Sequence, residues 1–129
     1  MTKHSTDLKT LLRDPSLLET RAFVAGEWVE ARDGATFDVT NPARGDVIAK
    51  VADMDRQDAA RAIEAAAGAM KGWAARTAKD RAGVMRKWFD LMMQNQDDLA
   101  RILTAEMGKP FPEAKGEIAY GASFIEWFG

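Results

Sequence analysis

Cysteine is absent from this sequence, and histidine occurs once, as His4. Without a thiol the chain can form no disulfide, hold no cysteine-ligated zinc and provide no thiolate nucleophile. The single imidazole lies in a polar N-terminal segment, where the sequence offers no second imidazole as a metal ligand. We therefore expect no metal site and no thiol chemistry within these 129 residues.

The sequence also lacks a long hydrophobic run and an excess of charge of either sign. Eighteen Lys and Arg residues stand against twenty Asp and Glu residues, which gives a formal net charge of -2 at pH 7. The charges are interspersed, so there is no basic stripe suited to phosphates or to a membrane surface. Residues 1–20 resemble neither a signal peptide nor a transit peptide, because they mix both charge signs with short leucine pairs. These patterns predict small-molecule or protein partners, no nucleic acid, no membrane and a cytoplasmic location.

Hydrophobic residues make up 47% of the chain, enough for a core, and the length fits one domain or a part of one. Turn residues separate short β-prone runs, and helical periodicity follows to the end of the chain. The predicted fold class is therefore α+β locally, with short N-terminal strands and then three or four helices. The β-prone runs are residues 23–25, 28–29, 37–40 and 47–51.

Residues 1–21 are interpreted as an N-terminal tail. Leu8, Leu11 and Leu12 recur at helical spacing before Pro15 and predict a short amphipathic helix over residues 6–13. A helix of this length is marginal by itself. We therefore expect it to dock on a larger body.

The helical part of the chain contains recognisable helix starts and stops. Asp55 can cap a helix that ends near Ala75, and Thr77 can cap a second helix. This second helix is expected to break near Asn95, and its continuation to end at Gly108. One face of the first helix carries the apolar residues Ala59, Ile63, Ala66, Ala67 and Met70. The second helix carries a predicted core stripe of Val84, Trp88 and Leu91.

Charges of both signs alternate along the second helix and its continuation. Such alternation is typical of a solvent-facing helix surface with ion pairs. The residues concerned are Asp80, Arg81, Arg86, Lys87, Asp90, Asp97, Asp98 and Arg101.

The last helix, expected to start around Pro112, is apolar on two sides. A helix with two apolar faces needs a partner on each, and a chain of this length is expected to cover only one. We therefore expect further protein on the second face. One face carries Ala114, Ile118, Gly121, Ala122 and Ile125, and the other carries Tyr120, Phe124 and Trp127.

The stretch from Leu103 to Glu117 carries the most specific motif of the chain. It reads Leu-Thr-Ala-Glu-Met-Gly-Lys-Pro-Phe-Pro-Glu-Ala-Lys-Gly-Glu. It resembles the N-terminal region of aldehyde dehydrogenases, which carry Leu-Thr-x-Glu-x-Gly-Lys-Pro-x-x-Glu-Ala-x-Gly-Glu. Residues 118–128 are most similar to the succinate-semialdehyde branch, and Asn-Pro-Ala-Arg-Gly at residues 41–45 is a second, weaker mark.

The resemblance implies that residues 22–129 are the N-terminal portion of the coenzyme-binding region, the leading part of the α/β aldehyde dehydrogenase fold. It implies an oxidoreductase that oxidises succinate semialdehyde or a similar aldehyde to the acid with NAD or NADP, commonly as a homo-oligomer. The family's nucleophile is a cysteine, so the chain alone is expected to be inactive, with the remainder of its own chain as a partner. No catalytic, cofactor-binding or metal-binding residue is assigned to this sequence.

The resemblance also places the last helix beside the aldehyde entry channel, with Tyr120 and Phe124 facing the mouth of the channel. Aromatic core packing explains these two residues equally well. Lys109 is interpreted as a solvated cation near the carbonyl groups of a helix end rather than as a catalytic amine. The alternative function for the whole chain is a non-catalytic helical protein-interaction module, with the double-faced helix as its binding surface.

Overall fold

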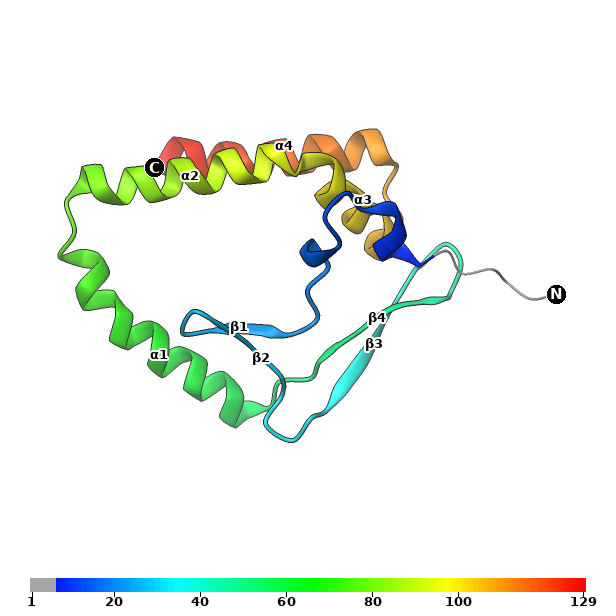
Figure 1. Ribbon diagram of the computed structural model, residues 1–129, viewed down its shortest axis with the longest axis horizontal. Coiled ribbons are helices and arrows are strands. Elements are labelled where there is room, and N and C mark those ends of the chain that lie inside the picture. Colours follow the sequence, from blue (N-terminus) through cyan, green and yellow to red (C-terminus); the bar gives the residue numbers. More distant parts are fainter. Residues whose placement is uncertain (1–6) are drawn as a thin grey trace.

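The computed structural model describes residues 7–129, so His4 and the first residue of the predicted helix over residues 6–13 lie outside the described residues. After two short 3-10 helices come two β-hairpins and then four α-helices, as the α+β prediction requires. The elements form an open frame (Figure 1). Helix α1 (Arg56–Ala74) connects the hairpins to a group made of α2 (Ala78–Gln94), α3 (Gln96–Met107) and α4 (Phe111–Phe128).

Both hairpins lie where the β-prone runs predicted strands. Strands β1 (Ala22–Val24) and β2 (Glu27–Val29) are antiparallel. They are joined by Ala25 and Gly26, whose φ values of 53° and 89° are those of a tight two-residue hairpin turn. Strands β3 (Thr36–Thr40) and β4 (Val47–Ala52) form the second antiparallel pair, with a register irregularity at the end of β3.

The predicted α-helix over residues 6–13 is wrong in type and extent. The described part contains two short 3-10 helices instead, η1 (Leu8–Leu11) and η2 (Pro15–Leu17). The Asp7 carboxylate accepts the N–H of Lys9, and such local side-chain bonds compete with a continuing helix. Docking on a larger body is confirmed, because Leu8, Leu12 and Leu18 are buried together against Ile48, Ile102 and Ala105.

The predicted helix ends are confirmed. Asp55 caps α1 through a complete capping box with Asp58, and Thr77 caps α2 by accepting the N–H of Asp80. The break at Asn95 separates α2 from α3. Gly108 then ends α3 in the left-handed conformation, with φ at 77°.

The predicted core stripe of α2 is wrong for the described chain. Val84, Trp88 and Leu91 are exposed, and Met85 and Phe89 are half-buried instead. The reason is that α4 packs against α2 on the side that carries these two residues and Met92, which leaves the second apolar side of α2 uncovered.

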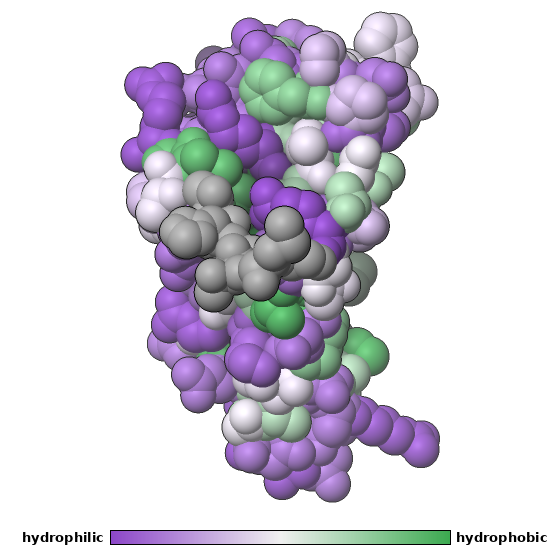
Figure 2. All heavy atoms as spheres, turned by 90° about the vertical axis from the view of Figure 1, so that its right-hand side faces the viewer, coloured by the Kyte–Doolittle hydropathy of each residue, from purple (hydrophilic) through white to green (hydrophobic). Residues whose placement is uncertain are grey.

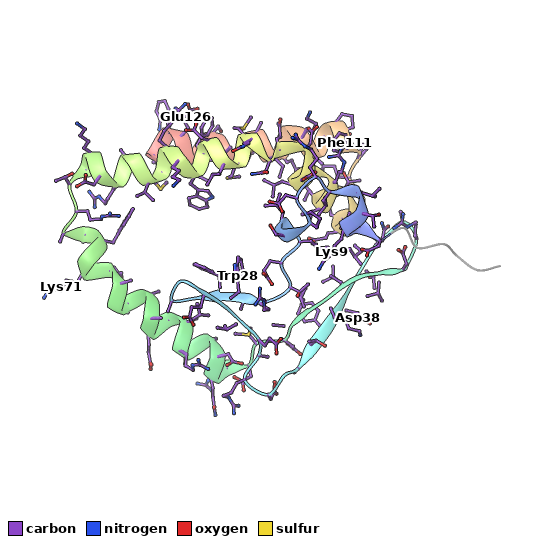
Figure 3. All side chains as sticks on the ribbon, in the orientation of Figure 1. Lys9, Trp28, Asp38, Lys71, Phe111 and Glu126 are labelled. Carbon is purple, nitrogen blue, oxygen red and sulfur yellow. The ribbon has the colours of Figure 1, made fainter. Side chains whose placement is uncertain are left out.

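The apolar face of α1 is also exposed within the described chain. Ile63 and Met70 are each 69% exposed, because α1 makes few contacts with any other element. Trp28 lies toward the inside of the frame, whereas Lys71 projects away from it (Figure 3).

The side of the molecule nearest α3 is mostly hydrophilic, and its hydrophobic side chains form small separate groups (Figure 2). None of the helices among residues 7–129 combines the length and apolar character needed to cross a membrane.

Two buried aspartates connect helix starts to distant loops. Asp98 was expected on the charged surface of the second helix and its continuation, but it is buried, and its carboxylate accepts the N–H of Asp14 at 2.9 Å and pairs with Arg101 at 3.1 Å. Asp58 is buried too, and it accepts the N–H of Arg32 at 3.2 Å. Each carboxylate thus satisfies backbone donors that would otherwise lose a partner on burial.

The protonation of Asp98 follows from this environment. Burial pushes the pKa of Asp98 upward, but the N–H donors of Asp14 and Arg13 and the Arg101 guanidinium outweigh burial, so the pKa lies below its ordinary value. When folding lowers the pKa of a carboxyl group, that group stabilises the fold at pH values above its pKa in the unfolded chain. The stabilisation is lost as the pH falls through the lower folded pKa.

We expect Asp98→Asn to release the N-terminal segment. A hydrogen bond to a charged group contributes about 1.5 to 3 kcal/mol, so the Asp14 N–H should exchange with solvent roughly tenfold to a hundredfold faster. Hydrogen exchange read by mass spectrometry measures this effect, and in the unsubstituted chain the protection should persist down to about pH 4 and decline below it.

Asp97→Asn is the matched control, because Asp97 directly precedes Asp98 and has Lys115, at the surface, as its ion-pair partner within residues 7–129. Exchange of the Asp14 N–H should not change in this variant. If the exchange of the Asp14 N–H is equally fast in both variants, Asp98 does not have the role given to it.

Candidate functional site

The candidate site is the outer face of α4, and the way α4 packs decides which residues reach that face. Ala114 and Ala122 are 0% exposed, because α4 packs against both α2 and α3 on the side that they share. The helix begins at Phe111, one residue before the predicted Pro112, with Pro110 at its N-cap. The predicted inner face is therefore confirmed, although Gly121 at its edge is exposed.

Tyr120 and Phe124 lie on the opposite, outer face. They are 66% and 47% exposed, and their rings meet edge to face with centroids 4.9 Å apart and planes at 79°. Trp127 extends the same face and is more exposed still. Packing within residues 7–129 therefore does not account for this aromatic pair, and its role at a channel stays a prediction.

The interpretation of Lys109 as a solvated cation at a helix end is wrong. The Lys109 side chain is 23% exposed and its Nζ pairs with the Glu117 carboxylate on α4. The two residues are eight positions apart, across the connection between α3 and α4. Spacing rules for a single helix cannot find such a pair, and this is why sequence reasoning missed Glu117.

Other polar contacts fix α4 at both of its ends. Near its start, Lys115 pairs with Asp97 at 2.7 Å, and the Lys115 carbonyl accepts a hydrogen bond from Gln96 at 3.0 Å. Near its end, Glu126 pairs with Arg86 of α2 at 2.9 Å. These contacts, together with the buried alanines, determine which face of α4 points outward.

The Gly-Lys-Pro motif now has a structural explanation at each position. Gly108 ends α3 with a positive φ, and a Cβ placed on it would lie 3.2 Å from Cγ of Pro42 in the β3–β4 turn. Lys109 pairs with α4, and Pro110 stands at the N-cap of α4. The three residues join α3, α4 and the second hairpin.

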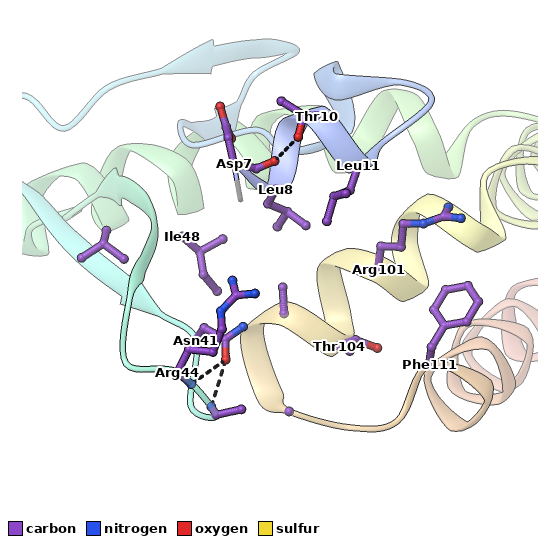
Figure 4. A pocket seen from close by; sticks show the side chains of 14 residues that line it. Asp7, Leu8, Thr10, Leu11, Asn41, Arg44, Ile48, Arg101, Thr104 and Phe111 are labelled. Carbon is purple, nitrogen blue, oxygen red and sulfur yellow. Dashed lines mark hydrogen bonds between the residues drawn. The ribbon is translucent and has the colours of Figure 1, made fainter. Parts of the chain in front are cut away.

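A cavity of about 990 Å³ lies between η1, the β3–β4 turn and α3 (Figure 4). Arg101 in its wall is paired with Asp98 and lies over the Phe111 ring at 5.4 Å, and Arg44 is paired with Asp46. These two arginines are already neutralised, so the cavity is assigned no ligand. Within residues 7–129, no group of three or more His, Asp or Glu side chains is arranged to hold a metal ion.

Comparison with protein families and relatives gives a consistent answer. The family model described as "Aldehyde dehydrogenase family" matches residues 28–129. A glutarate-semialdehyde dehydrogenase of Pseudomonas aeruginosa is 56% identical over 118 residues, which are 92% of this chain and 24% of that protein. A succinate-semialdehyde dehydrogenase of Escherichia coli, whose name gives NADP(+), is 53% identical over 91% of this chain and 24% of its own length.

A solved structure agrees with these relatives. The crystal structure of succinate-semialdehyde dehydrogenase from Burkholderia pseudomallei superposes with a TM-score of 0.88 at 56% identity. The match covers 90% of this chain and 24% of that one. The chain therefore spans about a quarter of the length of the proteins it matches.

We expect Gly108→Ala to destabilise the junction of α3, α4 and the second hairpin. A left-handed backbone costs an alanine roughly 1 to 2 kcal/mol, and the close approach of Pro42 adds to this cost. Unfolding in urea, followed by circular dichroism, measures the loss.

Gly116→Ala is the control, because Gly116 lies inside α4 with nothing within 4 Å of an added Cβ. This change should stabilise the chain by roughly 0.5 to 1 kcal/mol. A Gly108→Ala variant as stable as the unsubstituted chain would refute the role given to the motif.

Proposed function

Since the chain belongs to the aldehyde dehydrogenase family, we propose that it is the N-terminal segment of an enzyme that oxidises succinate semialdehyde, or a similar aldehyde, to the acid with NAD or NADP. The observation that carries this proposal is the identity of 56% and 53% to two acid-semialdehyde dehydrogenases over more than nine tenths of the chain. In this reaction the aldehyde and water give the acid, a hydride passes to the nicotinamide, and a proton is released.

No step of the reaction is assigned to a residue of this chain. The sequence contains no cysteine to form the covalent adduct of the family. Both described strand pairs are antiparallel hairpins, so residues 7–129 lack the parallel strand, glycine-rich turn and helix that bind a dinucleotide. We assign the nucleophile and the cofactor contacts to the remainder of the protein.

The remainder of the same chain is also the partner that we propose for the uncovered apolar faces. Large apolar side chains are exposed on α1, α2 and α4, and monomeric proteins rarely expose contiguous apolar patches of large area. The relatives are about four times longer than this chain, which supplies enough protein to cover these faces. By likeness to the family we further propose a homo-oligomeric, cytoplasmic enzyme. The residues concerned are Ile63 and Met70 on α1, Val84, Trp88 and Leu91 on α2, and Trp127 on α4.

The proposed contribution of this segment is the wall of the aldehyde entry channel. Tyr120 and Phe124 lie on the face of α4 that the rest of the described chain leaves open. A rigid helix carries them, because α4 is packed on its opposite face and fixed by ion pairs at both ends. The interaction-module alternative is not pursued, because the relatives named above are dehydrogenases.

We expect this chain to restore activity when it replaces the corresponding segment of the Pseudomonas aeruginosa relative. This chimaera should reduce NAD or NADP with succinate or glutarate semialdehyde, measured as absorbance of the reduced nicotinamide. The 129-residue chain alone should reduce neither cofactor, because it lacks the thiolate of the family.

The relative without its N-terminal segment is the control and should be inactive. A folded chimaera that oxidises no semialdehyde would refute the proposed function. Activity of the isolated chain would refute the proposal that catalysis resides elsewhere.

We expect Tyr120→Ala and Phe124→Ala in the chimaera to change the selection among aldehydes. Loss of aromatic surface from a channel wall should alter kcat/KM for short against bulky aldehydes by roughly 1 to 3 kcal/mol at each site. Thermal stability should fall only modestly, because both rings, which are exposed in the described chain, are proposed to face the channel rather than a packed core.

Ile125→Ala is the matched control on the packed face of α4. It should lower stability more, by about 2 kcal/mol or above, without changing the order of substrates. If the two aromatic variants behave like Ile125→Ala, they are core residues and do not line the channel.

A further inference from the structure

A carboxylate shares the outer face of α4 with the aromatic pair. Glu117 precedes Tyr120 by three residues and Phe124 by seven, which places all three side chains on one side of the helix. The Glu117 side chain is 45% exposed, comparable to the two aromatic residues. At the α-helical rise, Glu117 lies about 5 Å along the axis from Tyr120 and about 10 Å from Phe124.

Lys109 neutralises this carboxylate. It is the ion-pair partner of Glu117 within residues 7–129, and it reaches α4 from the connection that follows α3. Lys115, the one cation in the sequence of α4, is paired with Asp97 of α3 instead. Glu113, one turn before Glu117, has no ion pair in the described part of the chain and lies one turn farther from the aromatic pair. Glu117 is therefore the nearer of the two carboxylates, and Lys109 is its counter-charge.

The distances from Glu117 to Tyr120 and Phe124 decide whether its charge affects a ligand near these residues. The Debye length is about 10 Å at 0.1 M salt, so the charge of Glu117 is felt at both aromatic side chains. An uncompensated carboxylate there would repel a ligand with a negative charge and leave a neutral ligand of the same size unaffected.

We infer that Lys109 is a specificity-determining residue, because its pairing with Glu117 allows aldehydes that carry a carboxylate to approach Tyr120 and Phe124. The inference rests on the proposed function, in which these two aromatic residues stand at the channel mouth. It adds to the proposed function that the Lys109–Glu117 ion pair allows anionic aldehydes to enter the channel. Lys109 makes no contact with the reacting atoms in this role, and it acts on the encounter with substrate.

The test compares two four-carbon aldehydes that differ in charge, succinate semialdehyde and butanal, in the active chimaera. Lys109→Ala should raise the KM for succinate semialdehyde about threefold to tenfold at low ionic strength, with the kcat and the KM for butanal unchanged. The effect should disappear at about 1 M salt, where the Debye length is about 3 Å.

Three further variants separate charge from structure. Lys109→Arg keeps the charge and should restore the KM, and the double variant Lys109→Ala with Glu117→Gln should do the same by removing both charges. Lys115→Ala is the matched control, since it removes a cation that is paired away from Glu117. It should leave the ratio of the two KM values unchanged.

Equal effects of Lys109→Ala on both aldehydes, or no recovery in the double variant, would overturn this inference alone. A folded chimaera that oxidises no semialdehyde would overturn the proposed function and this inference with it. A third result is that Tyr120→Ala changes the order of substrates while Lys109→Ala changes the KM values for the charged and the neutral aldehyde equally. That result would support the channel assignment and show that Lys109 has no part in substrate selection.

Discussion

The packing of α4 against α2 and α3 is the constraint on which the rest of this structure depends. The side chains that α4 buries completely are small, Ala114 and Ala122, and α3 contributes Ala100, which is also 0% exposed. Methyl groups at a helix contact let the helix axes approach closely, so a large residue at these positions would separate the helices. Once this face is packed, Tyr120, Phe124 and Trp127 can only point outward.

Polar contacts fix the loops that the small apolar core does not hold in place. The buried hydrophobic residues within the described part of the chain are few, and all are leucine or alanine. Burial of apolar area alone therefore does little to fix the positions of the loops. Asp98 and Asp58 each lie in the first turn of a helix and each accept an N–H from a loop far back in the sequence. Because an unpaired buried N–H is costly, these carboxylates hold the N-terminal segment and the turn after β2 in place.

The junction between α3 and α4 connects this architecture to the candidate site. Gly108 allows the chain to turn beside Pro42, and this turn brings Lys109 to the outer face of α4. The Gly-Lys-Pro motif is part of the stretch that carries the family resemblance, and it serves both the fold and the charge balance near Tyr120. In the proposed enzyme, this motif would affect substrate selection without contacting the substrate.

The order of elements, the turns and the helix caps could be predicted from the sequence, because residues such as Asp55, Thr77 and Gly108 act on backbone groups within a few positions of themselves. The family could also be recognised, since its motif is continuous in the sequence. Which apolar side of α2 is packed, the burial of Asp98 and the pairing of Lys109 with Glu117 could not be predicted. Helical periodicity shows that Phe89 and Leu91 lie on different sides of α2, but only the position of α4 decides which of them is covered. These features depend on contacts between elements distant in sequence, and local propensities carry no information about them.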